Sequence, residues 1–206
     1  MLHPAGPAAQ TIADLWWVML ACGLAIFGLV MALLFVALRR PSGPSVHGED
    51  ERGTRVWMWG LGLGFPMATL AALTGYGLVI GERLLPRDAP DLVIVQAEAR
   101  QWAWTFRYAG ASVPATEGVL HIPAGRPVNV EITSTDVIHS FWVPRLAGKL
   151  DAIPGHVNVL RIEAADPGTY DGQSAEFSGS GYREHVFSVE VHDAVAWATF
   201  LRGGFP

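Results

Sequence analysis

The sequence predicts two membrane-spanning helices followed by an all-β domain. Two long segments of the first half, Leu15–Leu38 and Val56–Gly81, contain no charged residue. Each exceeds the roughly 20 apolar residues that a helix needs to cross a hydrocarbon core of about 30 Å. From Asp91 onward the pattern changes to short alternating stretches separated by Gly and Pro, which is typical of β-strands and turns. We therefore divide the chain into a tail 1–14, helix 15–38, loop 39–55, helix 56–81, linker 82–90 and domain 91–206.

The two apolar segments are interpreted as transmembrane helices. Pro66 in the second is compatible with this, because membrane helices tolerate proline where neighbouring groups satisfy the freed backbone. The alternative for the first segment is a cleaved signal peptide. That alternative is disfavoured because the apolar core is long, no basic residue precedes it and no small-residue cleavage site follows.

Basic residues predict the orientation of this pair of helices. Arg39, Arg40, Arg52 and Arg55 lie between the two segments, whereas no Lys or Arg precedes Leu15. Short loops rich in Lys and Arg remain on the cytoplasmic side of a membrane. The loop is therefore expected in the cytoplasm, with the N-terminus, the C-terminus and the β domain outside.

Four stretches of the outer domain show the alternation of half-buried strands. Gly- and Pro-containing turns separate them, and no long helical period interrupts them. This pattern predicts an antiparallel sandwich or barrel, and Asp193–Leu201 is predicted as a short terminal helix capped by Asp193. The predicted strands are Asp91–Ala99, Trp102–Tyr108, Val128–Thr133 and Val186–Val191.

Composition excludes several functions. The residues from Glu82 onward include 10 basic and 15 acidic side chains and so carry the whole net charge of −5, which disfavours nucleic-acid binding.

Cys22, the only cysteine, lies within the first apolar segment and is interpreted as a small packing residue. No nucleophile triad signature, phosphate-binding loop or zinc-protease motif is present. Surface or hydrogen-bonded histidines without a ligand role are expected at His3, His47, His121, His156 and His192.

Three segments of the sequence resemble one known family. Thr135–Leu146, continuing through Lys149–Gly155, resembles the first copper loop of subunit II of haem-copper oxidases, and Pro167–Gly179 resembles the second. Gln101–Tyr108 is similar to the aromatic strand that precedes these loops in the family. The resemblance implies a two-helix transmembrane hairpin carrying a cupredoxin-like Greek-key sandwich, located in a bacterial inner (plasma) membrane.

The resemblance also identifies the positions of a metal centre. In cytochrome c oxidases of this family, two cysteines, a histidine and a methionine of the second loop hold two copper ions together with a histidine of the first loop. A glutamate lies between the two cysteines, and Glu176 retains it here. The five copper-ligand positions of this chain are His139, Ser174, Ser178, Tyr182 and His185.

These replacements predict that the binuclear copper centre is absent. Two thiolates bridge the coppers in the family, whereas a serine hydroxyl stays protonated near neutral pH and is a hard, weak ligand. We expect a solvent-lined relic of the site. The alternative is a single weakly held copper or zinc ion at His139, Glu176 and His185.

Loss of this centre points to the quinol-oxidising branch of the family. Subunits of that branch resemble this chain in Pro144–Leu146, Pro167–Gly172 and Ser178–Gly181. The resemblance implies that electrons come from a membrane quinol bound chiefly in subunit I. The chain would then be a structural, non-catalytic subunit of an oxygen-reducing, proton-pumping complex with no cofactor of its own. Its expected partners are subunit I with its haems and copper, subunit III and the lipid bilayer.

Further residues match family positions at the interface with subunit I. The glutamate matching Glu176 reaches a magnesium ion shared with subunit I, and carboxylate oxygens suit magnesium. Lys149 and Asp151 match positions near the haem propionates, with an ordinary surface ion pair as the alternative. Trp102 and Trp104 match the aromatic strand, where one tryptophan receives electrons. Without copper that role has no destination, so we expect both to pack in the core.

The sequence is compatible with three other functions. The first is a haem-copper nitric oxide reductase, and the second is a cytochrome c oxidase variant into which electrons pass by another route. The third is a stand-alone membrane cupredoxin that binds copper through His139, His185 and Glu176. The aromatic strand and the Lys149–Gly155 segment favour a large partner over this third function.

Overall fold

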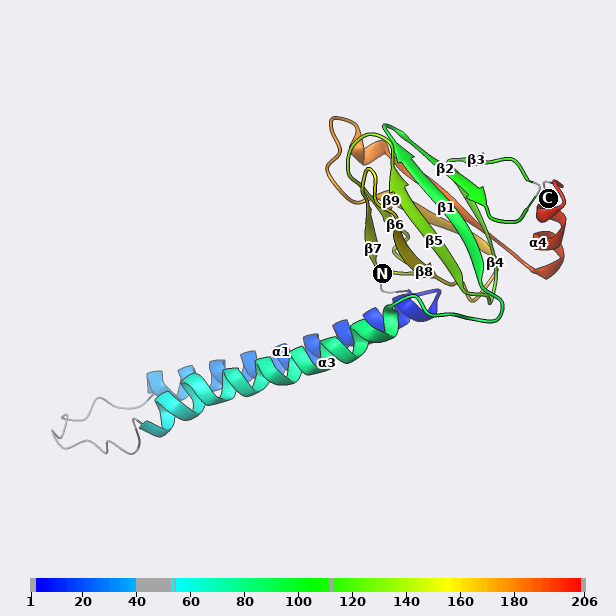
Figure 1. Cartoon of the computed structure of the whole chain (residues 1–206). Helices are drawn as coiled ribbons and strands as arrows, with labels where there is room; N and C mark the ends of the chain where they lie inside the picture. The colour runs from blue at the N-terminus through cyan, green and yellow to red at the C-terminus, as the bar shows by residue number, and fades with distance from the viewer. Residues whose placement is uncertain (1–2, 40–52, 54, 112, 205–206) are drawn as a thin grey trace. The chain divides into compact units, whose positions relative to one another are not determined.

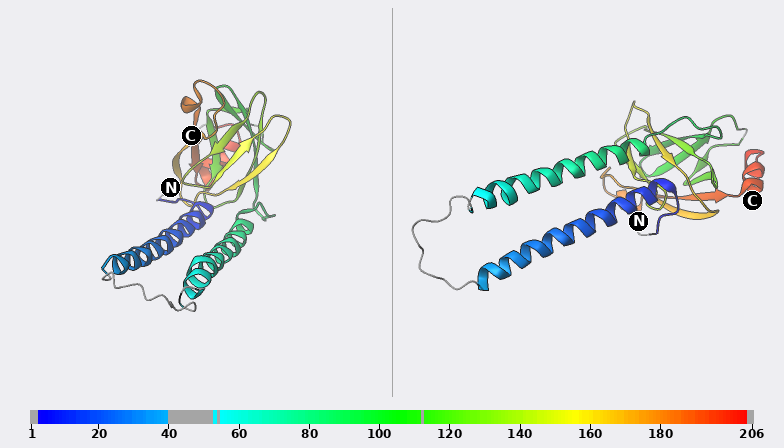
Figure 2. Two further views of the ribbon diagram at one scale, coloured as in Figure 1. Left: turned by 90° about the vertical axis from the view of Figure 1, so that its left-hand side faces the viewer. Right: turned by 90° about the horizontal axis from the view of Figure 1, so that it is seen from below.

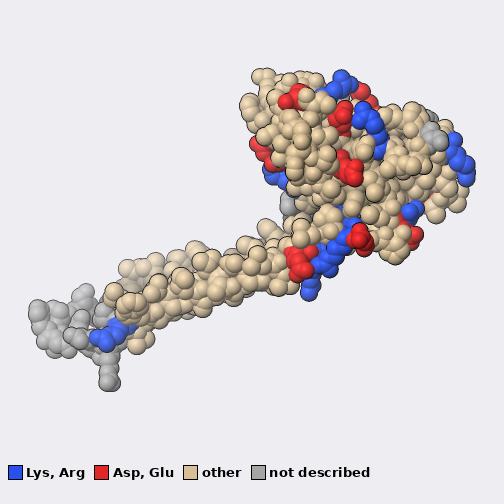
Figure 3. All heavy atoms as spheres, in the orientation of Figure 1, with Lys and Arg blue, Asp and Glu red and all other residues tan. Residues whose placement is uncertain are grey.

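The computed structural model describes residues 3–39, 53, 55–111 and 113–204. Two helices in it are long and apolar enough to cross a membrane: α1 (Pro7–Arg39), and η1 (Val56–Gly64) continued by α3 (Phe65–Leu84). They run in opposite directions, and no charged side chain interrupts the middle of their surface (Figures 2 and 3). The two predicted apolar segments are therefore confirmed as helices. Arg40, His47 and Arg52 of the predicted loop lie outside the described residues.

Helix α1 begins at Pro7, eight residues before the predicted membrane segment, and its first turns belong to the same compact unit as the β domain. The N–H of Ala5 donates to the carbonyl of Arg145 at 2.8 Å, and the N–H of Ala165 donates to the carbonyl of Ala5 at 2.9 Å. A Cβ on Gly6 would lie 2.0 Å from the carbonyl oxygen of Glu163, so only glycine permits this approach. The N-terminal segment is thus an integral part of the β domain.

The rest of the chain forms ten strands in two five-stranded sheets that make a sandwich (Figure 1). One sheet has the order β3-β2-β1-β5-β8 and the other β4-β10-β9-β6-β7. The strands are β1 (Val93–Arg100), β2 (Ala103–Tyr108), β3 (Thr116–Glu117), β4 (Val119–Pro123), β5 (Val128–Ser134), β6 (His139–Trp142), β7 (Lys149–Ala152), β8 (Asn158–Ile162), β9 (Gly168–Ser174) and β10 (Val186–His192).

The sandwich is confirmed, but the expectation that its strands are all antiparallel is wrong. Strand β1 pairs in parallel with β5, and β4 pairs in parallel with β10. After the β1–β2 hairpin the chain crosses to the second sheet as β4 and returns as β5, which therefore runs beside β1 in the same direction. Alternation of apolar residues reports which face of a strand is buried, but not the direction of the strand's neighbour.

The core lies between the two sheets and is built from the alternate residues of each strand. In β5 the inward residues are Val128, Val130 and Ile132, all fully buried. Trp104 of β2 lies at the centre of an aromatic group, with ring centroids 5.5 Å from both Phe141 and Phe187. Rings at such distances in edge-on or tilted arrangements stabilise a core beyond the area that they bury.

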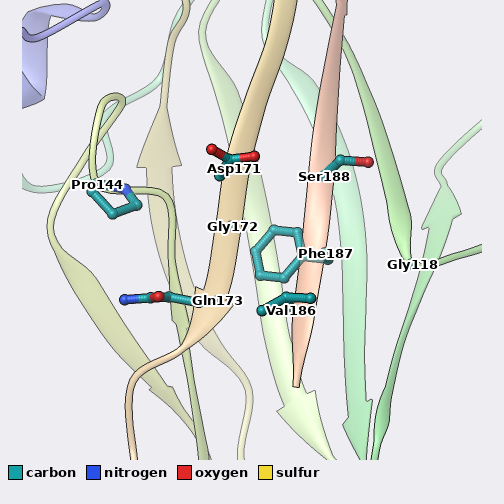
Figure 4. A pocket seen from close by; sticks show the side chains of 8 residues that line it. All are labelled: Gly118, Pro144, Asp171, Gly172, Gln173, Val186, Phe187 and Ser188. Atoms are coloured by element: carbon teal, nitrogen blue, oxygen red, sulfur yellow. The ribbon is translucent and has the colours of Figure 1, made fainter. Parts of the chain in front are cut away.

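A glycine in β9 makes room for one of these rings. Figure 4 shows Gly172 beside Phe187 on the neighbouring strand β10; both line a pocket together with Asp171 and Ser188. A Cβ on Gly172 would lie 2.3 Å from Cε2 of Phe187. The Phe187 ring cannot move away because it also packs against Trp104, Phe106 and Phe141.

We predict that Gly172→Ala destabilises the β domain by about 1–3 kcal/mol, the usual cost of inserting a methyl group into a well-packed core. Thermal unfolding of the detergent-solubilised chain would measure the loss. Gly148→Ala is the matched control, because a Cβ there meets only Ile12 Cδ1 at an ordinary 3.7 Å. Equal melting temperatures for Gly172→Ala and the wild type would contradict the described packing.

The predicted terminal helix is present as α4 (Ala194–Leu201), and Asp193 caps it by accepting hydrogen bonds from the N–H groups of Val195 and Ala196. Beside it lie two buried histidines from strands far apart in the sequence. Nδ1 of His121 is 2.8 Å from Nε2 of His192, and Phe200 of α4 stacks on the His121 ring. The expectation of hydrogen-bonded histidines is met by this pair, because the two rings bond to each other.

Burial, followed by the nearby His192 imidazole, lowers the pKa of His121 to about 4, against a smaller opposing effect of Glu190. The backbone N–H of His121 also donates to the buried hydroxyl of Tyr108 at 2.9 Å. Protonation of the His121 ring is therefore less favourable in the folded protein than in the unfolded chain. Burial also lowers the pKa of His192, against the opposing effects of Glu190 and Asp193.

We predict that the free energy of unfolding falls as the pH drops from about 6.5 to about 4, because the unfolded chain binds a proton at His121 that the folded chain does not. The slope from this proton cannot exceed about 1.4 kcal/mol per pH unit. Chemical denaturation at several pH values would measure it. The His121→Phe profile should be flatter over this range and that of His156→Ala unchanged; equal slopes in all three proteins would refute the assignment.

Candidate functional site

The positions that match the family's copper ligands come together at one end of the sandwich, opposite α4 (Figure 1). His139 is the first residue of β6, Ser174 the last of β9, and His185 immediately precedes β10. Two backbone hydrogen bonds join these strand ends. The N–H of Ser174 donates to the carbonyl of His185 at 2.9 Å, and the N–H of Ala175 donates to that of Ser140 at 3.0 Å.

His139 and His185 are fully buried, each with 0% of its surface exposed. Their ring centroids are 4.9 Å apart, with the ring planes at 79°. The indole of Trp104 stacks on His185 at 5.5 Å and meets His139 edge-on at 6.4 Å. The expectation of a solvent-lined relic is therefore wrong, because core aromatic residues cover both imidazoles.

Asp136 orients one of the imidazoles. Its Oδ1 is 2.8 Å from Nε2 of His139, and its carboxylate also accepts the backbone N–H groups of Gln101 at 2.7 Å and Val137 at 2.6 Å. Burial alone would raise the pKa of the Asp136 carboxyl, but these hydrogen bonds lower it to about 2. The carboxylate is thus charged at neutral pH and fixes the ring of His139. Asp136 was not singled out from the sequence.

The two serines at the cysteine positions are also buried. Oγ of Ser174 accepts the N–H of Ser140 at 3.3 Å, so this hydroxyl takes part in the junction between β6 and β9. Ser178 lies in the loop between β9 and β10, where its carbonyl accepts a hydrogen bond from the Gln101 side chain. Tyr182 begins the 3₁₀ turn η2 (Tyr182–Glu184), and its ring contacts Phe177 at 5.3 Å.

Several polar atoms at this end lack a hydrogen-bond partner within the described parts of the chain. They belong to His139, His185, Ser178, Ser140 and Trp104. In His185 neither ring nitrogen has a partner of normal geometry, although the backbone of Ala103 lies near one of them. Burial and the nearby His139 lower the pKa of His185, so its ring is neutral at pH 7. Buried polar groups without partners are rare in native proteins.

Glu176 does not join the two histidines. Its carboxylate lies 3.6 Å from Nζ of Lys149, and both side chains are partly exposed. Asp151 of β7 pairs in register with Ser140 of β6. Among the described residues, no group of three or more His, Cys, Asp and Glu side chains is placed to hold a metal ion. The predicted trio of His139, Glu176 and His185 is therefore not assembled.

The same end carries exposed aromatic side chains. Trp102 is 40% exposed and Phe177 71% exposed. The Trp102 ring lies 6.1 Å from His185 and packs against Gly179 and Gly181, both of which have positive φ. The expectation of core packing is thus confirmed for Trp104 and is wrong for Trp102.

Comparison with known proteins shows similarity to one family. Residues 111–192 match the family model described as "Cytochrome C oxidase subunit II, periplasmic domain". This range contains both copper-loop segments and all the ligand positions. The chain is similar to subunit II of the haem-copper oxidases, over this range by the family model and over most of its length by relatives.

Relatives include subunits of both branches of this family. Cytochrome c oxidase subunit 2 of Alkalihalophilus pseudofirmus is 29% identical over 209 residues, covering 95% of this chain and 60% of the relative. Quinol oxidase subunit 2 of Bacillus cereus is 28% identical over 199 residues, covering 93% of this chain and 68% of the relative. The chain therefore spans about two thirds of the length of these relatives.

A solved structure supports the fold. The periplasmic domain of subunit II of cytochrome oxidase from Bradyrhizobium japonicum aligns with a TM-score of 0.51 and 23% identity, covering 57% of this chain and 94% of that one. The predicted cupredoxin-like sandwich is therefore confirmed, and it stands beside a pair of helices long and apolar enough to cross a membrane.

The residues at the copper-ligand positions do not fit the binuclear copper centre of cytochrome c oxidases in this family. The site offers two imidazoles and two hydroxyls where the centre requires two bridging thiolates, and Tyr182 stands at the second histidine position. Ser174 is already engaged with the backbone N–H of Ser140. Cys22, the only cysteine of the chain, lies in the membrane helix α1 and cannot contribute a thiolate.

Proposed function

We propose that this subunit II supports a quinol-oxidising, oxygen-reducing haem-copper oxidase and carries no binuclear copper centre. In this reaction a membrane quinol is oxidised to quinone, and its electrons reduce oxygen to water in subunit I, coupled to proton pumping. The observation that carries the proposal is the pair of buried hydroxyls, Ser174 and Ser178, at the positions of the two bridging thiolates. A hydroxyl cannot replace a thiolate as a soft, electron-sharing ligand of copper.

The relatives leave the electron donor open, because the A. pseudofirmus and B. cereus proteins are named for different donors and are almost equally similar to this chain. The argument for quinol as the electron donor is therefore the set of metal-ligating side chains that the site offers. Without the thiolates, electrons from a soluble cytochrome c lack the usual acceptor in this subunit. A quinol bound elsewhere in the complex needs no electron acceptor in this subunit.

The subunit is non-catalytic in this proposal, and its partners are subunit I, with its haems and copper, and subunit III. Lys149, Asp151 and Glu176 would face subunit I. Exposed Phe177, next to Glu176, adds an apolar side chain to the same loop, and exposed aromatic residues are enriched at protein interfaces.

The location proposed is a bacterial inner membrane, with both termini on the periplasmic side. The N-terminal segment packs against the β domain, so these two parts share one side of any membrane that the helices cross. Arg39 and Arg55 mark the other ends of the two helices. Basic residues favour the cytoplasmic side.

We predict that Glu176 holds a magnesium ion at the boundary with subunit I. The Glu176–Lys149 pair contributes little stability because it is half exposed, so its carboxylate remains available to a hard cation. Elemental analysis of the purified complex should find magnesium in the wild type and its loss in Glu176→Gln. The control is Glu117→Gln, which removes a similarly exposed carboxylate paired with Arg100. Magnesium content unaffected by Glu176→Gln would contradict the prediction.

We further predict that the purified complex consumes oxygen with ubiquinol or menaquinol and only at the background rate with reduced cytochrome c. An oxygen electrode with each donor in turn measures this. Turnover with cytochrome c alone would instead establish the oxidase variant with another route for electrons. Reduction of nitric oxide but not oxygen would establish a nitric oxide reductase, and a chain that purifies without haem-containing partners would be a stand-alone cupredoxin.

A further inference from the structure

The short helix α4 is anchored to the β domain by two side chains. Of its eight residues only Trp197 and Phe200 are buried, and the helix packs against β4 and β10. Phe200 stacks on the rings of His121 and His192, with centroid separations of 4.4 Å and 5.8 Å. Trp197 stacks on the His192 ring at 6.3 Å. Both anchoring side chains of α4 therefore lie against the histidine pair.

The histidine pair lies outside the interior between the two sheets. In β4, His121 stands between Leu120 and Ile122, which are both fully buried in the core. Successive side chains of a strand point to opposite faces, so the His121 ring points away from that interior and toward α4. Removal of α4 would therefore uncover the pair without separating the two sheets.

Both imidazoles are neutral at pH 7 while α4 covers them, because burial lowers the pKa of His121 and of His192. Two carboxylates oppose this effect: Glu190 of β10 acts on both rings, and Asp193 at the start of α4 acts on His192. The third titratable group is Tyr108 of β2, which is neutral because burial raises its pKa. Burial is the largest of these effects, so proton uptake by the pair favours a state in which it is uncovered.

The hydrogen bond of the pair accommodates one proton between the two rings. Nδ1 of His121 and Nε2 of His192 are 2.8 Å apart, so one nitrogen carries the proton and the other accepts it. When both rings are protonated, both nitrogens carry a hydrogen, the bond is lost and two like charges face each other. The face of the Phe200 ring attracts a cation, but it offers no hydrogen bond to replace the lost one.

We propose that α4 is an acid-sensitive latch, which protonation of the His121–His192 pair releases from β4 and β10. An isolated helix of eight residues is not stable in water, so α4 unfolds on release while the strands stay paired. Trp197 and Leu201 also form one wall of a cavity bounded by the ends of β1 and β2, which release opens. The latch lies at the end of the sandwich opposite the candidate site (Figure 1), so it does not depend on the proposed function.

The pH range of release follows from the two states of His121. The uncovered ring has the ordinary histidine pKa of about 6.5, whereas the covered ring has a pKa of about 4. The covered state therefore loses stability as the pH falls from about 6.5 to about 4. Each proton taken up raises the ratio of released to docked α4 by up to roughly tenfold per pH unit.

The experiment is hydrogen exchange of the detergent-solubilised full-length chain between pH 7 and pH 4, followed by mass spectrometry. After correction for the intrinsic exchange rate, protection of the α4 amides should fall roughly tenfold or more between about pH 5.5 and about pH 4.5. Amides of β5, whose alternate side chains fill the core, should remain protected. Constant protection of α4 would overturn the proposal, and so would a parallel loss in β5, which would mean global unfolding.

Substitutions identify the groups that titrate. His121→Phe combined with His192→Phe keeps two rings against Phe200 but removes both imidazoles, so the pH response of α4 should vanish. Asp193→Asn keeps a capping side chain whose charge does not change in acid, and should release α4 over nearly the same pH range as the wild type. His156→Ala, at an exposed histidine, is the control and should match the wild type.

Two results from these variants would refute the latch. An unchanged pH response in the double histidine variant would show that other groups titrate, and loss of the response in Asp193→Asn would assign it to the helix cap. If the double variant failed to fold, His121→Gln would take its place, because its amide stays neutral in acid. Its response should fall to that of the one remaining imidazole, and a response equal to that of the wild type would contradict the proposal.

Discussion

The burial of His139 and His185 beneath Trp104 is the constraint on which this end of the molecule depends. Both imidazoles are fully enclosed, so the loops before β6 and before β10 must close over them. The closure is made by backbone hydrogen bonds between the ends of β6, β9 and β10, and by the Asp136 carboxylate, which joins the first loop to Gln101. Because these bonds involve no metal, the loops keep a defined conformation without the two thiolates on which the binuclear centre depends.

The loop between β9 and β10 has two faces with different chemistry. Ser174, Ser178 and His185 point to the interior, whereas Glu176 and Phe177 are open to a partner. A loop that is held by its own backbone can therefore change its buried residues without changing its outer surface. This separation explains how a protein of this fold can lose the thiolates of an electron-transfer centre and keep the outer surface that we propose contacts subunit I.

The opposite end of the sandwich depends on different contacts. There His121 and His192 satisfy each other, and aromatic residues of α4 cover them. The two histidine pairs thus differ in one physical respect: His121 and His192 are hydrogen-bonded to each other, whereas His139 and His185 retain ring nitrogens without a hydrogen-bond partner among the described residues.

The N-terminal segment is held to the β domain by hydrogen bonds to Arg145, Leu146 and Ala165, so the first long helix starts from within the folded domain.

The sequence by itself determined the two apolar helices, the sandwich, four of its strands and the capped terminal helix, because uninterrupted apolarity, alternation and Asp capping are local properties. It also determined the absence of thiolates at the copper positions. Strand β9 could not be predicted, since its Gly172 and Asp171 have low strand propensity and only pairing with β6 and β10 makes it a strand. Only the tertiary structure showed that Glu176 pairs with Lys149 and not with the two histidines. It also showed that Asp136 orients His139 and that His121 is hydrogen-bonded to His192. These contacts join residues on different strands and loops, and their distances are set by the packing of the two sheets.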